Sequence, residues 1–150
     1  MLEVGQKAPS FSLLDQNGTE VTLDSLNGKK TLIWFYPKAS TPGCTAEGCG
    51  LQAEKPAFDS EGIQIVGVSM DSVKRQSNFA TKQGFEYPLL ADPEGEMVKA
   101  YGAWGRKKFM GREYDGILRI SYLLDETGTV EQVYGKVKTK SHATDVLASL

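Results

Sequence analysis

A strand-like run that leads into a cysteine-bearing loop places the tightest limit on how this chain can fold. Residues 31–36 are apolar, β-branched and aromatic, and they have the length of a buried strand. Pro42 and Gly43 then mark a loop, and the residues from Cys44 onward follow a helical pattern. Cys44 is therefore expected where the carboxyl end of a strand passes into the amino end of a helix. In open α/β sheets, that crevice is where ligands bind.

The predicted position of Cys44 favours a reactive thiol. Unpaired N–H groups and the dipole at a helix amino end stabilise an anion, and the thiolate is the nucleophilic form of cysteine. The alternative is a buried cysteine that packs as a small apolar side chain. The strand–loop–helix context, with polar Thr41 and Thr45 nearby, favours the reactive thiol.

Length and charge narrow the class of protein. A chain of 150 residues suits one domain, because domains cluster at roughly 100–150 residues. The net charge of −2 argues against a nucleic-acid partner, which would favour a basic excess. No apolar run approaches the roughly 20 residues of a membrane span, and residues 1–5 lack the basic start and apolar core of a signal peptide. We therefore expect residues 1–150 to form one cytoplasmic domain without a membrane partner.

Cysteine and histidine are too scarce for a metal centre. The chain holds two cysteines and one histidine, whereas a structural zinc site takes about four ligands. We therefore expect neither a metal nor another cofactor. His142 lies in a polar carboxy-terminal segment, and we interpret it as a solvated surface side chain that forms no Cys–His catalytic pair.

The order of the predicted elements points to one fold class. Asn17-Gly18 between apolar segments predicts an amino-terminal β-hairpin. Strand 31–36, a helix to about residue 60 and a strand over 63–70 form a βαβ unit with a right-handed crossover. The other expected elements are a helical turn over 24–28, a helix over 73–83 ended by Gly84, an extended piece over 87–90, a helix around 94–101, a loop over 102–114 with solvated basic side chains, strands over 117–124 and 129–134, and a helix over about 140–149. This order predicts a thioredoxin-like α/β fold, with a central mixed sheet and helices on both faces.

The motif around Cys44 carries a family resemblance. Pro37-x-x-x-Thr41-x-x-Cys44 resembles the active-site signature of the peroxiredoxins. Residues 35–45 together with Cys49 are similar to the bacterioferritin comigratory protein, or Q, branch of that family. Further likeness lies in Gly5-x-x-Ala8-Pro9-x-Phe11, in Gly102-x-Trp104-Gly105 and in Gly116-Ile117-x-Arg119, so the resemblance spans almost the whole chain.

The resemblance implies an antioxidant thiol peroxidase that acts on hydrogen peroxide and organic hydroperoxides. The Cys44 thiolate would attack a peroxide oxygen and become a sulfenic acid. The Thr41 hydroxyl and the backbone N–H groups of Gly43 and Cys44 would be the nearby donors to the substrate, and Arg119 the distant one. Pro37 would shape the loop and shield the sulfur.

Two charged residues have plainer alternatives. Alternation along strand 117–124 puts Arg119 on the same face as Ile117 and Ser121, where a solvated arginine is the alternative to one paired with the thiolate. Glu47, three residues after Cys44, complements the helix dipole in our preferred interpretation, rather than taking part in catalysis.

Cys49 is the candidate resolving cysteine, which the resemblance implies would attack the sulfenic acid and form a disulfide with Cys44. Five residues on an ideal helix rotate by about 140° and rise by about 7.5 Å, so a bridge requires the first turns to unwind. Gly48 and Gly50 weaken the helix by about 1 kcal/mol each relative to alanine, and Pro56 limits its continuation. A buried inert thiol is the alternative.

The chain has no Cys-x-x-Cys of its own, so an external dithiol must reset the cycle. Membership of the Q branch implies thioredoxin as that donor and a monomeric enzyme. A thiol–disulfide oxidoreductase is a second hypothesis, although four residues separate the cysteines where such enzymes have two. A redox sensor whose disulfide alters a partner surface is a third.

Overall fold

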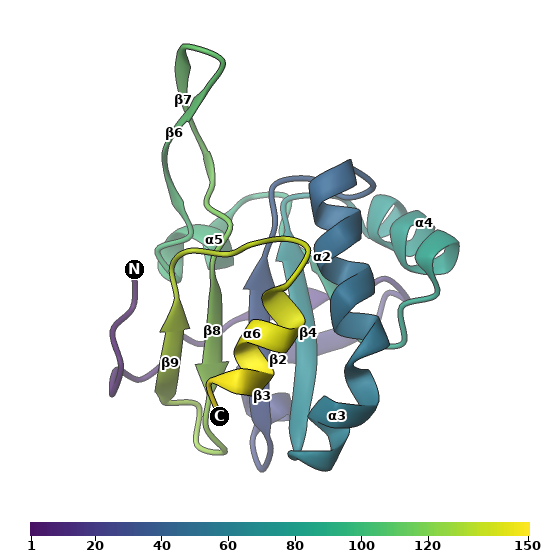
Figure 1. The fold of residues 1–150 in the computed structure, drawn as a ribbon, viewed down its shortest axis with the longest axis vertical. Coiled ribbons are helices and arrows are strands. Elements are labelled where there is room, and N and C mark those ends of the chain that lie inside the picture. Colours follow the sequence, from purple (N-terminus) through teal and green to yellow (C-terminus); the bar gives the residue numbers. More distant parts are fainter.

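A seven-stranded mixed sheet organises residues 1–150, all of which are described by the computed structural model (Figure 1). The strand order is β2-β1-β5-β4-β3-β8-β9, with a separate two-stranded sheet of β6 and β7. The strands are β1 Ser12–Leu14, β2 Glu20–Thr22, β3 Lys30–Phe35, β4 Ile63–Ser69, β5 Leu89–Ala91, β6 Trp104–Phe109, β7 Arg112–Ile117, β8 Ser121–Leu124 and β9 Val130–Tyr134. The helices are α1 Leu23–Leu26, α2 Pro42–Ala53, α3 Lys55–Ser60, α4 Val73–Gln83, α5 Glu96–Ala100 and α6 His142–Ala148.

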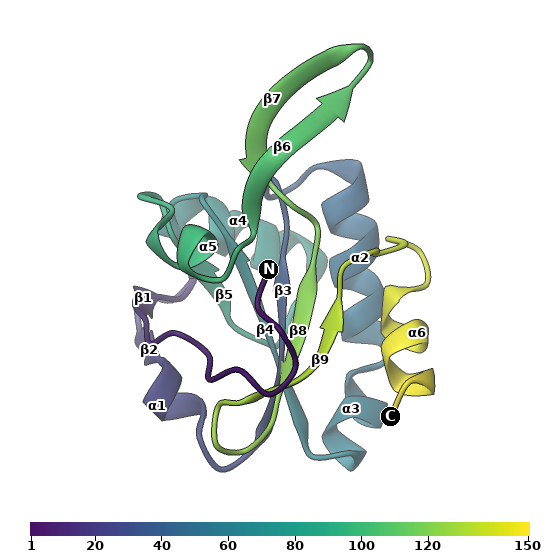
Figure 2. The same ribbon diagram turned by 90° about the vertical axis from the view of Figure 1, so that its left-hand side faces the viewer.

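The β3–α2–α3–β4 segment is the predicted βαβ unit. β3 and β4 pair in parallel, β4 pairs in parallel with β5, and β8 runs antiparallel to β3. Side chains of β3 are buried on both faces because helices cover both sides of the sheet (Figure 2). Its odd-numbered and even-numbered positions therefore feed two separate cores.

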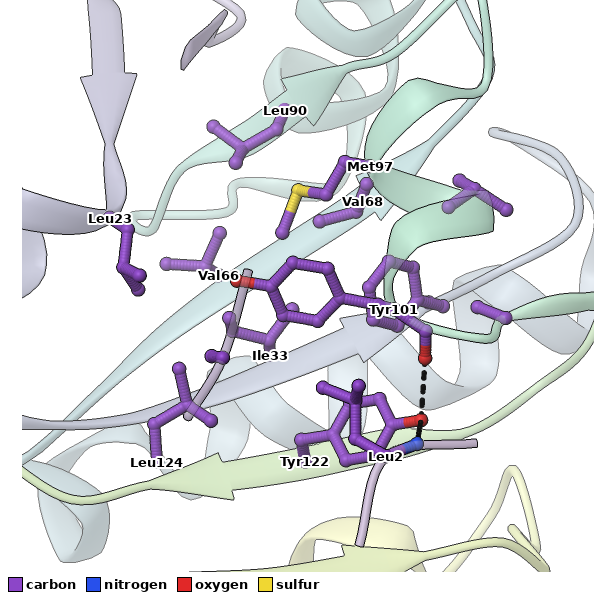
Figure 3. Close-up of a cluster of buried hydrophobic side chains, with 14 of the residues drawn as sticks. Leu2, Leu23, Ile33, Val66, Val68, Leu90, Met97, Tyr101, Tyr122 and Leu124 are labelled. Atoms are coloured by element: carbon purple, nitrogen blue, oxygen red, sulfur yellow. Dashed lines mark hydrogen bonds between the residues drawn. The ribbon is translucent and has the colours of Figure 1, made fainter. Parts of the chain in front are cut away.

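One core lies between the sheet and α1 and α5, and Figure 3 shows its centre. There the Tyr122 hydroxyl donates to the Tyr101 carbonyl at 2.6 Å and accepts from the Leu2 N–H at 3.0 Å. The other core lies under α2, α3, α4 and α6, and it includes Trp34, Cys44 and Val146. Cys44 thus stands at the edge of a packed apolar layer.

The predicted amino-terminal hairpin and the predicted helix over 73–83 are both present in the structure. The hairpin around Asn17-Gly18 is β1–β2, which pair in antiparallel register. The predicted helix over 73–83 is α4, where the Ser72 hydroxyl accepts from the Arg75 N–H and Gly84 adopts the left-handed conformation, with φ 73°.

The predicted loop over 102–114 is wrong. β6 and β7 form an antiparallel hairpin that stands away from the main sheet (Figures 1 and 2). Met110 and Gly111 connect them with φ of 50° and 79°, as a two-residue type I′ turn requires. Most of the hairpin is exposed on both faces, so its sequence carries no alternating apolar pattern that would mark a strand. Arg106, Lys108 and Arg112 are exposed, as expected for solvated basic side chains, whereas Lys107 is half-buried.

The predicted strand over 117–124 is interrupted. β7 ends at Ile117 and β8 begins at Ser121, so Arg119 lies in a connection between the two sheets. The neighbours of Arg119 fix this connection, because the Leu118 N–H donates to the Ala103 carbonyl and the Ile120 carbonyl accepts from the Phe35 N–H. Strand alternation therefore does not decide where Arg119 points.

The helix expected to run to residue 60 is divided at Glu54. Pro56 occupies the first turn of α3, where its missing N–H has no helical partner to lose. α2 itself is unbroken from Pro42 to Ala53, so Cys44 and Cys49 share one helix. None of the helices combines the length and apolar character that crossing a bilayer would demand.

Candidate active site

Cys44 lies in the first turn of α2, directly after the loop that leaves β3. Its side chain is 0% exposed, and Thr41 is the residue at which the helix begins. The loop is anchored by the segment that follows β4, because the Ala39 N–H donates to the buried carboxylate of Asp71 at 2.7 Å. The predicted position of Cys44, at a strand end and a helix amino end, is confirmed.

Arg119 reaches Cys44 from the connection that leads into β8, the strand beside β3. Its Nη2 donates to the Cys44 Sγ at 3.5 Å, and its Nη1 donates to the Glu47 Oε1 at 2.7 Å. One guanidinium therefore holds both acidic groups of the first two turns of α2. The Arg119 side chain is 23% exposed, so the charge lies at the boundary between the core and solvent.

Glu47 faces the protein interior and is 0% exposed. Burial raises its pKa to about 7, although the hydrogen bond and charge of Arg119 act in the opposite direction. The interpretation of Glu47 as a first-turn acid that complements the helix dipole is wrong, since the first turn of α2 holds no acidic residue. Its position in the second turn, on the same side as Cys44, points it toward Arg119 instead.

His142 is buried, at 3% exposure, and the interpretation of a solvated surface histidine is wrong. Its Nε2 lies 2.8 Å from the Ser121 hydroxyl and 3.9 Å from the Glu47 Oε2. Burial lowers the pKa of His142 to about 4, so the imidazole is neutral near pH 7. His142 lies on the buried face of α6 with Ala143 and Val146. The polar residues that precede it in the chain gave no indication of this face.

Thr41, Gly43 and Pro37 lie in or beside the loop that leads to Cys44, and each has different surroundings. The Thr41 hydroxyl donates to the Lys38 carbonyl at 2.7 Å and makes no helix-capping bond. A Cβ on Gly43 would lie 3.2 Å from the Arg119 Nη2, so the glycine gives the guanidinium room to approach. Pro37 is half-buried in the loop between β3 and α2.

Cys49 points to a different neighbour from Cys44. Its Sγ lies 3.5 Å from the Gln83 Oε1 of α4, and burial raises the pKa of its thiol. Both cysteines are free thiols. In this helical state they therefore face separate surroundings, and a disulfide between them requires α2 to open.

Lys107 in the β6–β7 hairpin is close enough to the site to interact with its charges. It lies opposite Tyr114 and is half-buried, and burial together with the charge of Arg119 lowers its pKa. Sequence reasoning assigned no role to this lysine, to Ser121 or to His142. A helical spacing of His142, Ala143 and Val146 was the one available signal, and it concerns packing rather than chemistry.

Comparisons with known proteins give a consistent result. Residues 4–133 match the model of the AhpC/TSA family. A putative peroxiredoxin bcp of Haemophilus influenzae is 48% identical over 141 residues, which cover 94% of this chain and 91% of that protein. Peroxiredoxin Bcp of Escherichia coli K12 is 42% identical over 146 residues, covering 97% and 94%.

Solved structures agree. Peroxiredoxin Q of Xanthomonas campestris superposes with a TM-score of 0.87 at 43% identity, covering 93% of this chain and 88% of that one. Another structure from that organism, with the same TM-score and coverage at 42% identity, concerns alkyl peroxide reduction by its bacterioferritin comigratory protein. A cysteine variant of Xylella fastidiosa PrxQ has a TM-score of 0.92 at 29% identity, covering 99% and 95%. These likenesses confirm the predicted thioredoxin-like fold.

Proposed function

This chain belongs to the AhpC/TSA family and is a peroxiredoxin, a thiol peroxidase, and we propose that Cys44 attacks the peroxide and Cys49 resolves the product. Hydrogen peroxide and organic hydroperoxides are the proposed substrates. The observation that carries the assignment of Cys44 is its contact with Arg119, because a fully buried sulfur lies 3.5 Å from a guanidinium. A buried anion is stable only when such a partner compensates it.

The attack is a displacement at oxygen. The thiolate electron pair forms an S–O bond, the O–O bond breaks, and the leaving oxygen takes up a proton as water or an alcohol. Arg119 stabilises the charge that moves from sulfur to oxygen. The N–H groups of Gly43 and Cys44, in the first turn of α2, have no intrahelical acceptor and are the proposed local donors. Thr41 adds a hydroxyl at the helix start, and Pro37 shields the sulfur from solvent.

The second step joins the two cysteines. The Cys49 thiol displaces water from the Cys44 sulfenic acid, which leaves one disulfide and one water molecule. Opening α2 must break the contact of Cys49 with Gln83 and the bond from the Tyr87 hydroxyl to the Gly48 carbonyl, at 3.0 Å. Both are single side-chain bonds, each contributing about 1 kcal/mol, which suits a helix that opens locally.

A dithiol reductant must return the disulfide to two thiols, and we infer thioredoxin or a protein of similar chemistry. We further propose that residues 1–150 act as one domain, as a monomer, in the cytoplasm. The absence of a second dithiol in the chain supports the external reductant. The match of the family over almost the whole chain supports the single domain.

Turnover tests the proposed function. Purified protein with thioredoxin, thioredoxin reductase and NADPH should consume hydrogen peroxide and tert-butyl hydroperoxide over many cycles. Cys44→Ser should abolish NADPH oxidation, whereas Ser72→Ala, which removes only the cap of α4, should retain it. A single turnover that stops at the disulfide with every reductant tried would instead support the redox-sensor hypothesis.

A further inference from the structure

The buried carboxylate of Glu47 holds an unusual electrostatic position. Its Oε1 accepts from Arg119, but its Oε2 is buried and has no hydrogen-bond partner. The His142 Nε2 lies 3.9 Å from this oxygen, which is beyond hydrogen-bond length. An ionised oxygen without a partner is costly to bury, so this oxygen favours a protonated carboxyl group.

The charge balance gives an independent argument. Cys44 and Glu47 are both 0% exposed, and Arg119 donates to both through its two terminal nitrogens. With both acids ionised, two buried anions would share one cation. With one acid protonated, the group of three carries no net charge. Two buried acids that depend on the same counter-ion are expected to lose their protons as a coupled pair, not independently.

We propose that Cys44 and Glu47 share one proton through their common contact with Arg119. When the S–H bond of Cys44 breaks, the electron pair stays on sulfur and an O–H bond forms on the Glu47 carboxylate. The inference rests on the proposed function of Cys44 as the attacking thiol. It makes Glu47 a positioning residue for the proton rather than a residue that touches the peroxide.

The same pairing balances the peroxide reaction. Thiolate, protonated Glu47 and hydroperoxide give sulfenic acid, ionised Glu47 and alcohol. Sulfur donates two electrons as the O–O bond breaks. Glu47 releases one proton through solvent at the exposed edge of Arg119, and this balances the one proton that the leaving oxygen takes up. The ionised Glu47 then regains Arg119 as its full counter-ion, so the buried charge is the same before and after.

His142 completes the arrangement from α6. Burial lowers its pKa to about 4, so it brings no positive charge that would keep Glu47 ionised, and burial raises the pKa of Glu47 to about 7. The Ser121 hydroxyl pairs with the imidazole at 2.8 Å and holds it beside the Glu47 Oε2. The other titratable groups whose charges interact with this cluster are Tyr36, Tyr87, Lys107 and Asp145. Burial raises the pKa of both tyrosines, which leaves them neutral.

The first test replaces the carboxyl group by its neutral isostere. In Cys49→Ser protein, the rate of Cys44 alkylation by iodoacetamide is measured against pH, with and without Glu47→Gln. A shared proton predicts that E47Q moves the midpoint of reactivity to lower pH by about one unit or more, because Arg119 then serves the thiolate alone. Glu94→Gln removes an exposed carboxylate as the matched control and should leave the midpoint unchanged.

A purely structural role for Glu47 gives a different outcome. Glutamine keeps an oxygen for Arg119, so the midpoint would stay in place, or rise if the guanidinium moved away. Either result overturns the proposal. Neither depends on peroxide, so a failure of the peroxidase function would appear separately, as Cys44 that alkylates normally but is not oxidised.

A second measurement keeps the glutamate and covers a variant that fails to fold. Infrared difference spectra are recorded on Cys49→Ser protein before and after Cys44 alkylation, at the pH of the alkylation midpoint. Neutralising the sulfur should weaken a carboxylic-acid C=O band and strengthen a carboxylate band as Glu47 ionises. A spectrum without a change in either band would also overturn the shared proton.

Discussion

Gly48 packs so closely against Phe85 that a Cβ would fall 2.6 Å from the ring, whereas a Cβ on Gly50 would meet nothing within 4 Å. The two glycines beside Cys49 therefore differ in kind. Gly48 is required by the packing of α2 on the core, and Gly50 only weakens the helix. A substitution at Gly50 therefore tests the stability of α2, whereas a substitution at Gly48 tests the packing of α2 against the core.

Gly50→Ala should stabilise α2 by about 1 kcal/mol, because the helix loses a residue of high backbone entropy. If disulfide formation needs α2 to open, the same change should slow the step from sulfenic acid to disulfide about fivefold. Stopped-flow fluorescence after a peroxide pulse, with denaturant unfolding on the same protein, measures both. A more stable variant with an unchanged resolving rate would show that α2 does not open around Gly50.

Gly48→Ala should act in the opposite direction on stability. The added methyl group must displace the Phe85 ring or Trp34, and overpacking of this kind costs about 1–3 kcal/mol. Urea unfolding of the two alanine variants side by side gives the comparison. Equal stability of both would contradict the close packing of Gly48.

Arg119→Lys should lower the second-order rate with peroxide by about 10²–10³-fold. Lysine keeps the charge but cannot donate to Cys44 and Glu47 at once from a planar fork, so one preorganised donor is lost. Stopped-flow kinetics under single-turnover conditions measure the rate. Arg112→Lys, an exposed change on the hairpin, is the control and should react at the rate of the unaltered protein. A rate for R119K within a factor of a few of that control would remove Arg119 from the reaction.

The buried acid and the buried base should give stability profiles of opposite slope. The pKa of Glu47 rises from 4.5 to about 7 on folding, so the folded state holds the extra proton and stability falls as pH increases through that window. The pKa of His142 falls from 6.5 to about 4, so the unfolded state holds the extra proton and stability increases with pH there. Between about pH 4.5 and 6.5 the two contributions oppose each other.

Glu47→Gln should therefore leave the pH dependence of stability that His142 contributes without the opposing contribution of Glu47. Its free energy of unfolding should increase by a few kcal/mol between about pH 4.5 and 6.5, a range over which these two groups cancel in the unaltered protein. Urea unfolding at several pH values, with Glu94→Gln as control, measures the slope. If E47Q shows no more increase than its control, the opposed titration is wrong.

Local patterns in the sequence were sufficient for much of the fold. The apolar run of β3, the Ser72 cap and the Gly84 stop mark their elements by rules that act within a few residues. The position of Cys44 followed from the same local reasoning. Local patterns did not predict the β6–β7 hairpin, because strands exposed on both faces have no apolar periodicity. In addition, Met110 is not a residue that usually marks a tight turn.

The contacts of the site lie beyond local patterns. Arg119 is 75 residues from Cys44 in the chain, and the break between β7 and β8, rather than strand alternation, sets its direction. Glu47 is buried where Arg119 reaches it, and His142 belongs to α6, which packs against α2. Burial of a polar side chain depends on what the rest of the fold brings to it, which spacing along one segment does not encode.

Intact mass after one equivalent of hydrogen peroxide tests the central claim most directly. Fully reduced protein should lose two hydrogens as Cys44 and Cys49 form a disulfide, and Cys49→Ser should gain one oxygen, as a sulfenic acid on Cys44. Bridging that is absent from the unaltered protein while Cys44 is oxidised would remove Cys49 from the mechanism. Two free thiols after minutes with peroxide would contradict the role of Cys44 itself.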